Sequence, residues 1–257
     1  MIKGVILDLD GTVYIGSKLL PYARETVREL RERGYVILFL TNNSTLSRTL
    51  AVRKLSTLGI EADAREVMTS SFAVSQYVSD NWGPSRVLPI GERGLIEELE
   101  LAGHKIVKDS ESAEVVVVGL DREVTYSKLA EAHTALIRSA KFVATNKDTT
   151  LPTESGTVPG AGSIVAFLEV STGLKATPVG KPERYIMDLA LRRMGLEREE
   201  VILVGDRVDT DIEAARRAGI KALLLVRGHS GPTRLPEVTV IESLSGLLDF
   251  LKREDDG

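Results

Sequence analysis

The sequence VILDLDGT, residues 5–12, changes from apolar to acidic within a few positions of the start of the chain. Its apolar part, residues 5–9, is interrupted only by Asp8 and is a short run of the kind that forms a strand buried on both faces. Asp8 and Asp10 lie two positions apart at the end of this run, so strand geometry would turn their side chains to the same side. Two such carboxylates can share a divalent cation or divide into a nucleophile and an acid–base group. Gly11 lets the backbone turn sharply beside them.

Strand-like and helix-like segments alternate outward from this stretch. In chain order the pattern predicts a helix over 23–33, a strand over 36–40, a helix over 46–58, a strand over 201–204, a helix over 212–218 and a strand over 222–226. Glycine is favoured just past a helix C-terminus, and Gly34, Gly59 and Gly219 each follow one of these helices. Strand–helix–strand order favours parallel strands joined by right-handed crossovers. We therefore expect an α/β fold with a doubly wound parallel sheet.

The middle of the chain repeats this alternation between two Gly- and Pro-containing segments, residues 81–84 and 177–180. Within it the pattern predicts strands over 86–90, 115–118 and 142–144, and helices over 95–102, 127–139 and 163–170. We predict a discontinuous core domain formed by residues 1–81 and 180–257. Residues 82–179 are predicted to form an inserted α/β domain.

The composition is that of a soluble globular protein: 257 residues, 43% hydrophobic, 27% charged, with a net charge of −4. The chain has no cysteine, which excludes disulfides, thiolate metal sites and a cysteine nucleophile. The longest unbroken apolar run, residues 35–40, is far too short to span a bilayer. Acidic residues arrive before any long apolar stretch, which disfavours a secretory signal. The mild acidity disfavours non-specific nucleic-acid binding. We expect a cytoplasmic protein with neither nucleic-acid nor membrane partners.

Polar clusters follow two further predicted strands directly. Residues 41–44, Thr-Asn-Asn-Ser, come after one strand, and residues 205–207, Gly-Asp-Arg, come after another. Lys181 adds a cation just before a helical segment. Ligands of open parallel sheets bind outside the carboxyl ends of the strands, so these segments can converge on one crevice. Carboxylate oxygens suit Mg²⁺, while hydroxyl, amide and ammonium donors suit a phosphoryl group. Each cluster taken alone could instead be structural, as a strand end, a helix N-terminus stabilised by polar side chains, or a solvated surface lysine.

The four clusters together resemble the motifs of the haloacid dehalogenase (HAD) superfamily of phosphotransferases. Residues 8–12, Asp-Leu-Asp-Gly-Thr, resemble the first motif and Thr41 the second. Lys181 resembles the third motif, and residues 205–211 resemble the fourth. The segments around them, Leu-Thr-Asn-Asn-Ser and Gly-Lys-Pro, are similar to the NagD-like subfamily of nitrophenyl-phosphate, phosphoglycolate and pyridoxal phosphatases. That resemblance implies a Rossmann-like core with a large α/β cap inserted between the second and third motifs.

The resemblance assigns catalytic and metal-binding roles to the acidic residues. Asp8 would attack phosphorus and form an aspartyl-phosphate. Asp10 would protonate the leaving oxygen and later deprotonate the hydrolytic water. Mg²⁺ would be held by the carboxylates of Asp8 and Asp206 and by the backbone carbonyl of Asp10. Asp211 would orient Lys181 or a metal-bound water from outside the metal's own ligands.

The resemblance also implies residues that bind the substrate. Thr41, Asn42 and Lys181 would bind the phosphoryl oxygens. In the predicted cap, Asn146 and Asp148 belong to a segment similar to the subfamily's Thr-Asn-x-Asp, which faces the core. We expect them to contact the substrate, although they could equally be simple turn residues. The cap would close over the site and select the leaving group.

The sequence thus predicts a Mg²⁺-dependent phosphatase acting on small phosphomonoesters, and a homodimer is a further expectation by analogy with the family. A phosphotransferase or phosphomutase of the same superfamily is an alternative. A dehalogenase fits less well, because halide loss needs no acid at Asp10. A non-catalytic, phosphate-responsive receiver module would need neither Asp10 nor a cap. A nicotinamide oxidoreductase would carry Gly-x-Gly-x-x-Gly after the first strand, where residues 8–11 stand instead.

Overall fold

The computed structural model describes residues 1–153, 156–227 and 238–255, and the chain divides into two compact units. The first unit comprises Met1–Thr41, Val52–Met68 and Lys181–Gly257, and the second comprises Asn42–Ala51 and Thr69–Gly180. Each unit is built on a parallel sheet with helices, which confirms the α/β class. The predicted domain limits at residues 81/82 and 179/180 stay predictions.

The first unit contains a six-stranded sheet in the order β15-β14-β13-β1-β4-β5. Its strands are β1 (Gly4–Asp8), β4 (Val36–Thr41), β5 (Val67–Thr69), β13 (Val201–Gly205), β14 (Lys221–Leu225) and β15 (Thr239–Ile241). Strand β1 pairs in parallel with β13 on one side and with β4 on the other. All five of its residues are buried, as its apolar run predicts. The residue at its carboxyl end is Asp8.

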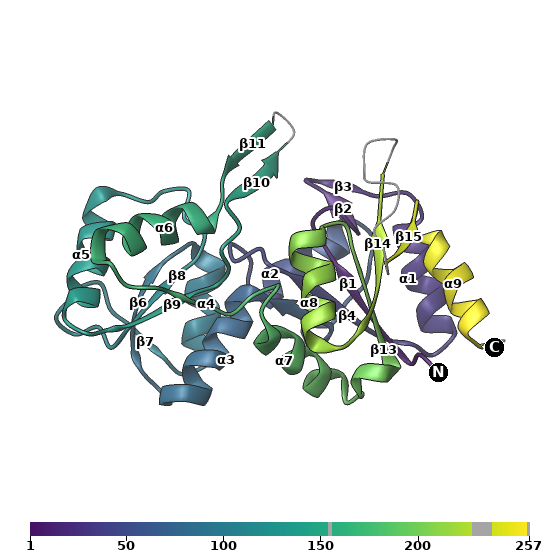
Figure 1. Ribbon diagram of the computed structural model, residues 1–257, viewed down its shortest axis with the longest axis horizontal. Coiled ribbons are helices and arrows are strands. Elements are labelled where there is room, and N and C mark those ends of the chain that lie inside the picture. The colour runs from purple at the N-terminus through teal and green to yellow at the C-terminus, as the bar shows by residue number, and fades with distance from the viewer. Residues whose placement is uncertain (154–155, 228–237, 256–257) are drawn as a thin grey trace. The chain divides into compact units, whose positions relative to one another are not determined.

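Helices cover both faces of this sheet, as a doubly wound fold requires. Figure 1 shows α1 (Ala23–Glu32) and α9 (Ser245–Asp255) packed together on one face, and α7 (Arg184–Met194) and α8 (Glu213–Ala218) on the other. Helix α2 (Arg48–Thr57) follows β4 along the chain. The short strands β2 (Tyr14–Ile15) and β3 (Lys18–Leu19) pair antiparallel directly after the turn that ends β1. A π-helical turn over Val208–Ile212 joins β13 to α8, so the chain between these two elements is wider than an α-helix.

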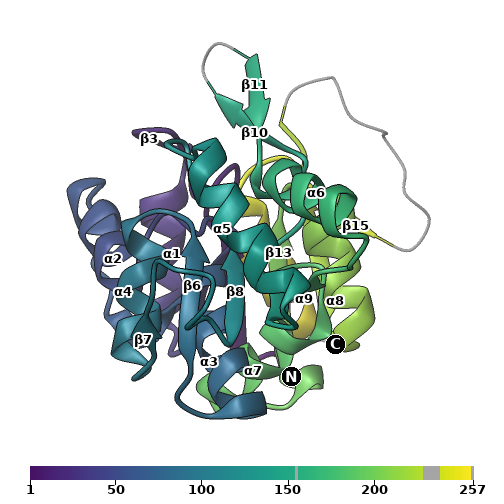
Figure 2. The same cartoon turned by 90° about the vertical axis from the view of Figure 1, so that its left-hand side faces the viewer.

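The second unit contains a five-stranded sheet in the order β12-β9-β8-β6-β7, in which each pair of neighbouring strands is parallel. Its strands are β6 (Arg86–Ile90), β7 (Lys105–Ile106), β8 (Val115–Val118), β9 (Lys141–Ala144) and β12 (Thr177–Pro178). Its helices are α3 (Ser70–Trp82), α4 (Arg93–Leu101), α5 (Tyr126–Ile137) and α6 (Ala161–Thr172). Figure 2 shows α5 and α6 lying over the strands of this sheet. Two further strands, β10 (Thr150–Thr153) and β11 (Gly156–Pro159), pair antiparallel.

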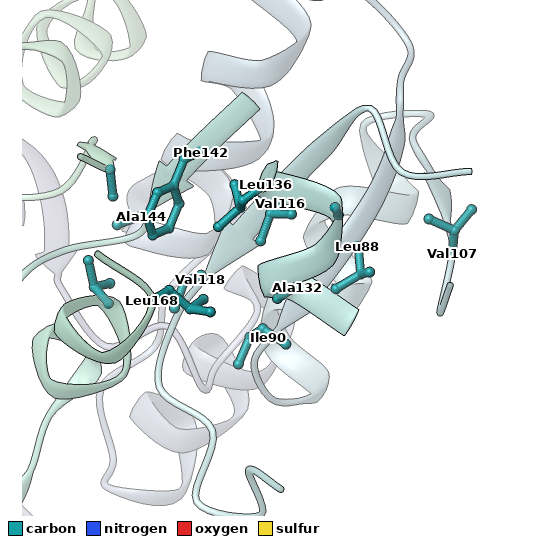
Figure 3. Close-up of a cluster of buried hydrophobic side chains, with 13 residues drawn as sticks. Leu88, Ile90, Val107, Val116, Val118, Ala132, Leu136, Phe142, Ala144 and Leu168 are labelled. Atoms are coloured by element: carbon teal, nitrogen blue, oxygen red, sulfur yellow. The ribbon is translucent and has the colours of Figure 1, made fainter. Parts of the chain in front are cut away.

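The core of the second unit explains why its strands are continuous apolar runs. Alternate residues of β8, Val116 and Val118, lie in one cluster with side chains from β6, β9, α5 and α6 (Figure 3). The intervening Val115 and Val117 are buried as well, on the opposite face of the strand. Truncating a buried leucine of this cluster, such as Leu136, would cost about 2–5 kcal/mol.

The longest helix of the described residues is α3, with 13 residues. No helix in the described ranges is long and apolar enough to cross a membrane.

Candidate functional site

Three carboxylates converge at the carboxyl ends of β1 and β13 in the first unit. Asp8 is the last residue of β1, Asp206 directly follows β13, and Asp211 lies in the π-helical turn that comes next. One oxygen from each lies within 4.8 Å of the others. The structure therefore brings together Asp8 and Asp206, as the sequence predicts, and adds the carboxylate of Asp211 to the same cluster.

Lys181 lies among these carboxylates. Its side chain is buried, and its Nζ donates to Oδ1 of Asp8 at 2.5 Å and to Oδ1 of Asp211 at 2.6 Å. Burial by itself lowers the pKa of Lys181, but the charges of Asp211 and Asp8 outweigh it and raise the pKa above its ordinary value. The ammonium is therefore charged at every physiological pH, and its two hydrogen bonds fix where it lies.

The carboxylates of the cluster are not fully compensated by this one ammonium. Burial raises the pKa of Asp8 well above its ordinary value, and the nearby ammonium of Lys181 opposes this only in part. Burial, followed by the charge of Asp211, also raises the pKa of Asp206, whose Oδ2 accepts from Arg227 at 3.3 Å. The other oxygen, Asp206 Oδ1, is buried without a hydrogen-bond partner among the described residues. An unsatisfied buried carboxylate oxygen beside two further carboxylates is a donor set that fits a hard divalent cation.

Gly11 keeps this cluster open. Its φ of +107° lies where side-chain-bearing residues are strained, and a Cβ there would lie 2.3 Å from Oδ2 of Asp206. Gly205 is constrained by the lack of space alone, since a Cβ there would lie 2.3 Å from the Cβ of Asp211. The two glycines that flank the acidic motifs are therefore required for the carboxylates to approach the backbone.

The carboxylate of Asp10 has different neighbours. Its Oδ2 accepts from the hydroxyl of Thr41 at 3.2 Å and from the hydroxyl of Tyr14 at 3.4 Å. Tyr14 is fully buried, and Nζ of Lys54 lies 3.7 Å from the centroid of its ring. The structure thus joins Thr41 to Asp10, two residues that the sequence singled out.

Tyr14 and Lys54 were missed by the sequence analysis. One feature of the sequence points to Tyr14, which is the first aromatic residue after the acidic motif and lies four positions beyond Asp10. No feature of the sequence points to Lys54, because a lysine in a helix normally indicates a solvated face.

Three other predicted residues form a cluster of their own within the second unit. The Nδ2 of Asn42 donates to Oδ2 of Asp148 at 3.1 Å, and the Nδ2 of Asn146 donates to the backbone carbonyl of Asn42 at 2.8 Å. The backbone N–H of Asp148 in turn donates to Oδ1 of Asn146 at 3.0 Å. Asn146 is buried and Asp148 half-buried. The structure therefore brings Asn42, Asn146 and Asp148 together, and their contact with a substrate stays a prediction.

Comparisons with known proteins agree with this geometry. A family model described as haloacid dehalogenase-like hydrolase matches residues 5–105, and one described as HAD-hydrolase-like matches residues 178–247. The chain is 40% identical over 237 residues to a 5′-nucleotidase of Bacillus subtilis, which covers 92% of this chain and 91% of that protein. It is 39% identical over 235 residues to an acid sugar phosphatase of Staphylococcus haemolyticus, covering 91% and 89%. Among solved structures, a p-nitrophenyl phosphatase from Archaeoglobus fulgidus is similar with a TM-score of 0.90 and 34% identity, covering 97% of this chain and 99% of the other.

Together the two family models cover every residue of the acidic cluster. The range matched by the first includes Asp8, and the range matched by the second includes Lys181, Asp206 and Asp211. They bear out the resemblance that the sequence motifs indicate. The chain belongs to the haloacid dehalogenase-like hydrolase family, and within it to the NagD-like phosphatases that hydrolyse small phosphate monoesters.

Proposed function

We propose that the protein is a Mg²⁺-dependent phosphatase in which the carboxylate of Asp8 attacks the phosphorus of a small phosphomonoester. The observation that supports this best is the burial of Asp8 between an ammonium group and two further carboxylates. A structural ion pair would need only Lys181 and one acid. The additional carboxylate of Asp206 pairs with Arg227 through Oδ2 only, and its buried Oδ1, which has no partner among the described residues, fits a cation.

In the first step, an oxygen of Asp8 forms a bond to phosphorus as the bond from phosphorus to the ester oxygen breaks. Lys181 holds Asp8 in a fixed orientation and offers positive charge to the phosphoryl oxygens. Asp211 fixes Lys181 through the second of its hydrogen bonds. Mg²⁺, held by Asp8, Asp206 and the backbone carbonyl of Asp10, would keep the buried carboxylates ionised and reduce the repulsion between two anions.

Asp10 supplies and recovers the proton. Its carboxylic acid gives a proton to the departing ester oxygen, which leaves as an alcohol. The resulting carboxylate then takes a proton from the water that attacks the aspartyl-phosphate, so that Asp8 is released and inorganic phosphate forms. Thr41 lies beside Asp10 and is proposed to bind a phosphoryl oxygen along with Lys181 and Asn42. Asn146 and Asp148 are proposed to act on the substrate from the second unit.

The leaving group is proposed to be a sugar or a nucleoside, because the relatives compared above are named for sugar phosphates and nucleotides. A panel of sugar phosphates and nucleoside monophosphates, with release of inorganic phosphate as the readout, would identify it. The same readout separates hydrolysis from transfer to another acceptor, the phosphotransferase or phosphomutase alternative. A homodimer and a cytoplasmic location stay predictions.

The mechanism is tested with p-nitrophenyl phosphate and the Asp8→Asn variant. Hydrolysis is expected to require Mg²⁺, to stop with EDTA, and to fall by roughly 10³-fold or more in Asp8→Asn, because an amide is a poor nucleophile. Asp249→Asn is the matched control, since Asp249 is exposed on α9 in the same unit. Wild-type turnover by Asp8→Asn, or full activity in EDTA, would show that the proposed mechanism is wrong.

A further inference from the structure

The turn after β1 places Tyr14 against Asp10 through the backbone itself. The N–H of Gly11 donates to the carbonyl of Tyr14 at 2.8 Å, and the N–H of Tyr14 donates to the carbonyl of Leu9 at 3.1 Å. These bonds close residues 9–14 into a compact loop, and the Tyr14 side chain is completely buried. The phenol therefore has little freedom to move away from Asp10.

Two hydroxyl groups converge on the same oxygen of Asp10. The hydroxyls of Tyr14 and Thr41 both donate to Oδ2, whereas Oδ1 accepts no hydrogen bond from any residue in the described ranges. The single hydroxyl proton of Thr41 is also the one proposed above for a phosphoryl oxygen, so Tyr14 is the donor that remains at Oδ2 once a substrate binds. The hydrogen bond from Tyr14 fixes the carboxyl group of Asp10 through Oδ2 and leaves Oδ1 as the oxygen that can face another group.

Lys54 completes the arrangement from α2. Its ammonium lies over the face of the Tyr14 ring, 3.7 Å from the centroid, at a distance at which a cation attracts the ring. This contact holds the ring in place and polarises its O–H bond toward the acceptor. Burial, followed by the charge of Asp10, raises the pKa of Tyr14 above its ordinary value, so the phenol keeps its proton and remains a donor throughout.

We propose that Tyr14 is a positioning residue that holds the carboxyl group of Asp10 through Oδ2, so that Oδ1 is the oxygen presented to the departing ester oxygen. This inference rests on the acid role proposed above for Asp10. Tyr14 itself neither gains nor loses a proton. Its effect must therefore appear with substrates whose leaving groups need a proton, and be small with substrates whose leaving groups do not.

The test compares kcat/KM for ethyl phosphate and p-nitrophenyl phosphate in Tyr14→Phe. The parameter kcat/KM reports phosphoryl transfer to Asp8, the step in which the leaving group departs. Nitrophenolate leaves without a proton, whereas ethoxide does not. Loss of the Tyr14 hydroxyl is expected to lower kcat/KM for ethyl phosphate by about tenfold, and that for the nitrophenyl ester by less than about twofold. The ratio of the two values does not depend on how much of the variant is folded.

Three further variants make the outcome decisive. Tyr22→Phe, at an exposed tyrosine of the same unit, is expected to leave the ratio unchanged. Asp10→Asn is expected to lower the ratio by roughly 100-fold, and Asp10→Asn/Tyr14→Phe by no more than that. If Asp10→Asn shows its selective loss while Tyr14→Phe affects both esters equally or neither, the inference about Tyr14 is wrong and the proposed function stands. If Asp10→Asn shows no selective loss, the acid role fails and the inference fails with it.

Discussion

Replacing Lys181 with methionine is expected to destabilise the first unit far more than the loss of an exposed ion pair would. The buried ammonium of Lys181 donates to Asp8 at 2.5 Å and to Asp211 at 2.6 Å. Methionine retains a long apolar side chain at this position. It leaves two buried carboxyl groups without the cation that both contact.

The size of the effect follows from this burial. Breaking a buried ion pair by removing one partner costs about 3–5 kcal/mol. Burial already raises the pKa of Asp8, so this carboxyl can take up a proton instead of staying charged, which keeps the cost near the lower end of that range. We expect Lys181→Met to lower the free energy of unfolding by about 3 kcal/mol at pH 8, roughly a 150-fold change in the unfolding equilibrium.

The loss is expected to shrink as the pH falls. Without the ammonium the pKa of Asp8 rises further above its unfolded value, so the folded variant binds more protons than the unfolded chain, and its stability increases toward acid pH. Urea unfolding followed by circular dichroism, in EDTA at pH 8 and at pH 5, measures both effects. Lys221→Met is the control, because Lys221 forms an exposed pair with Glu254 whose loss should cost about 0–1 kcal/mol. A Lys181→Met variant as stable as the wild type at pH 8, or equally destabilised at both pH values, would refute this reasoning.

The carboxylate cluster, the turn beside it and the second unit each give one more testable outcome. Asp206→Asn is expected to raise the Mg²⁺ concentration for half-maximal activity at least about tenfold, as measured by metal titration. Gly11→Ala is expected to raise the same Mg²⁺ concentration, because the added Cβ displaces the carboxylate of Asp206. Gly34→Ala is the control for backbone strain alone, because Gly34 also has a positive φ but has open space around it. It should leave the Mg²⁺ titration unchanged. The pKa of Glu169 is lowered to about 2, since burial is outweighed by hydrogen bonds that include one from Lys147. Glu169→Gln should therefore lower the free energy of unfolding by about 1 kcal/mol at pH 7. The difference from the wild type should disappear as the pH falls from about 4.5 to 2, which thermal melting at a series of pH values measures.

Apolar runs predicted the four- to six-residue strands of both sheets closely, because strands covered on two faces are almost entirely apolar. The two- and three-residue strands β5, β7, β12 and β15 were not predicted. The run at 201–204 became β13, and the run at 115–118 became β8. Helix α3 was missed, because three serines are buried in it alongside apolar residues such as Phe72 and Val74 and obscure the apolar pattern. The hydroxyls of Ser70, Ser71 and Ser75 donate to backbone carbonyls, so polar residues occupy buried positions that an apolar pattern does not reveal.

The rule that ligands bind at the carboxyl ends of parallel strands predicted the meeting of Asp8, Asp206 and Lys181. The rule could not predict that the carboxylate of Asp10 lies apart from these three side chains. A two-residue spacing places Asp8 and Asp10 on the same face only while the strand continues. The strand ends at Asp8, and the turn at Gly11 then directs the next carboxylate toward Tyr14. Side-chain contacts across such a turn depend on backbone dihedral angles that the sequence does not display.

The central strand of the larger sheet has consequences for how the chain is made. Gly4 pairs with Val36 on one side and with Val201 on the other. One edge of β1 therefore stays unpaired during synthesis until a strand 201 − 4 = 197 residues downstream has been made. At typical rates of protein synthesis, that partner leaves the ribosome roughly 10–40 s after β1. Nearly all of the second unit emerges in this interval and can fold first. Until then the nascent chain exposes an apolar strand edge, which is a natural target for chaperones.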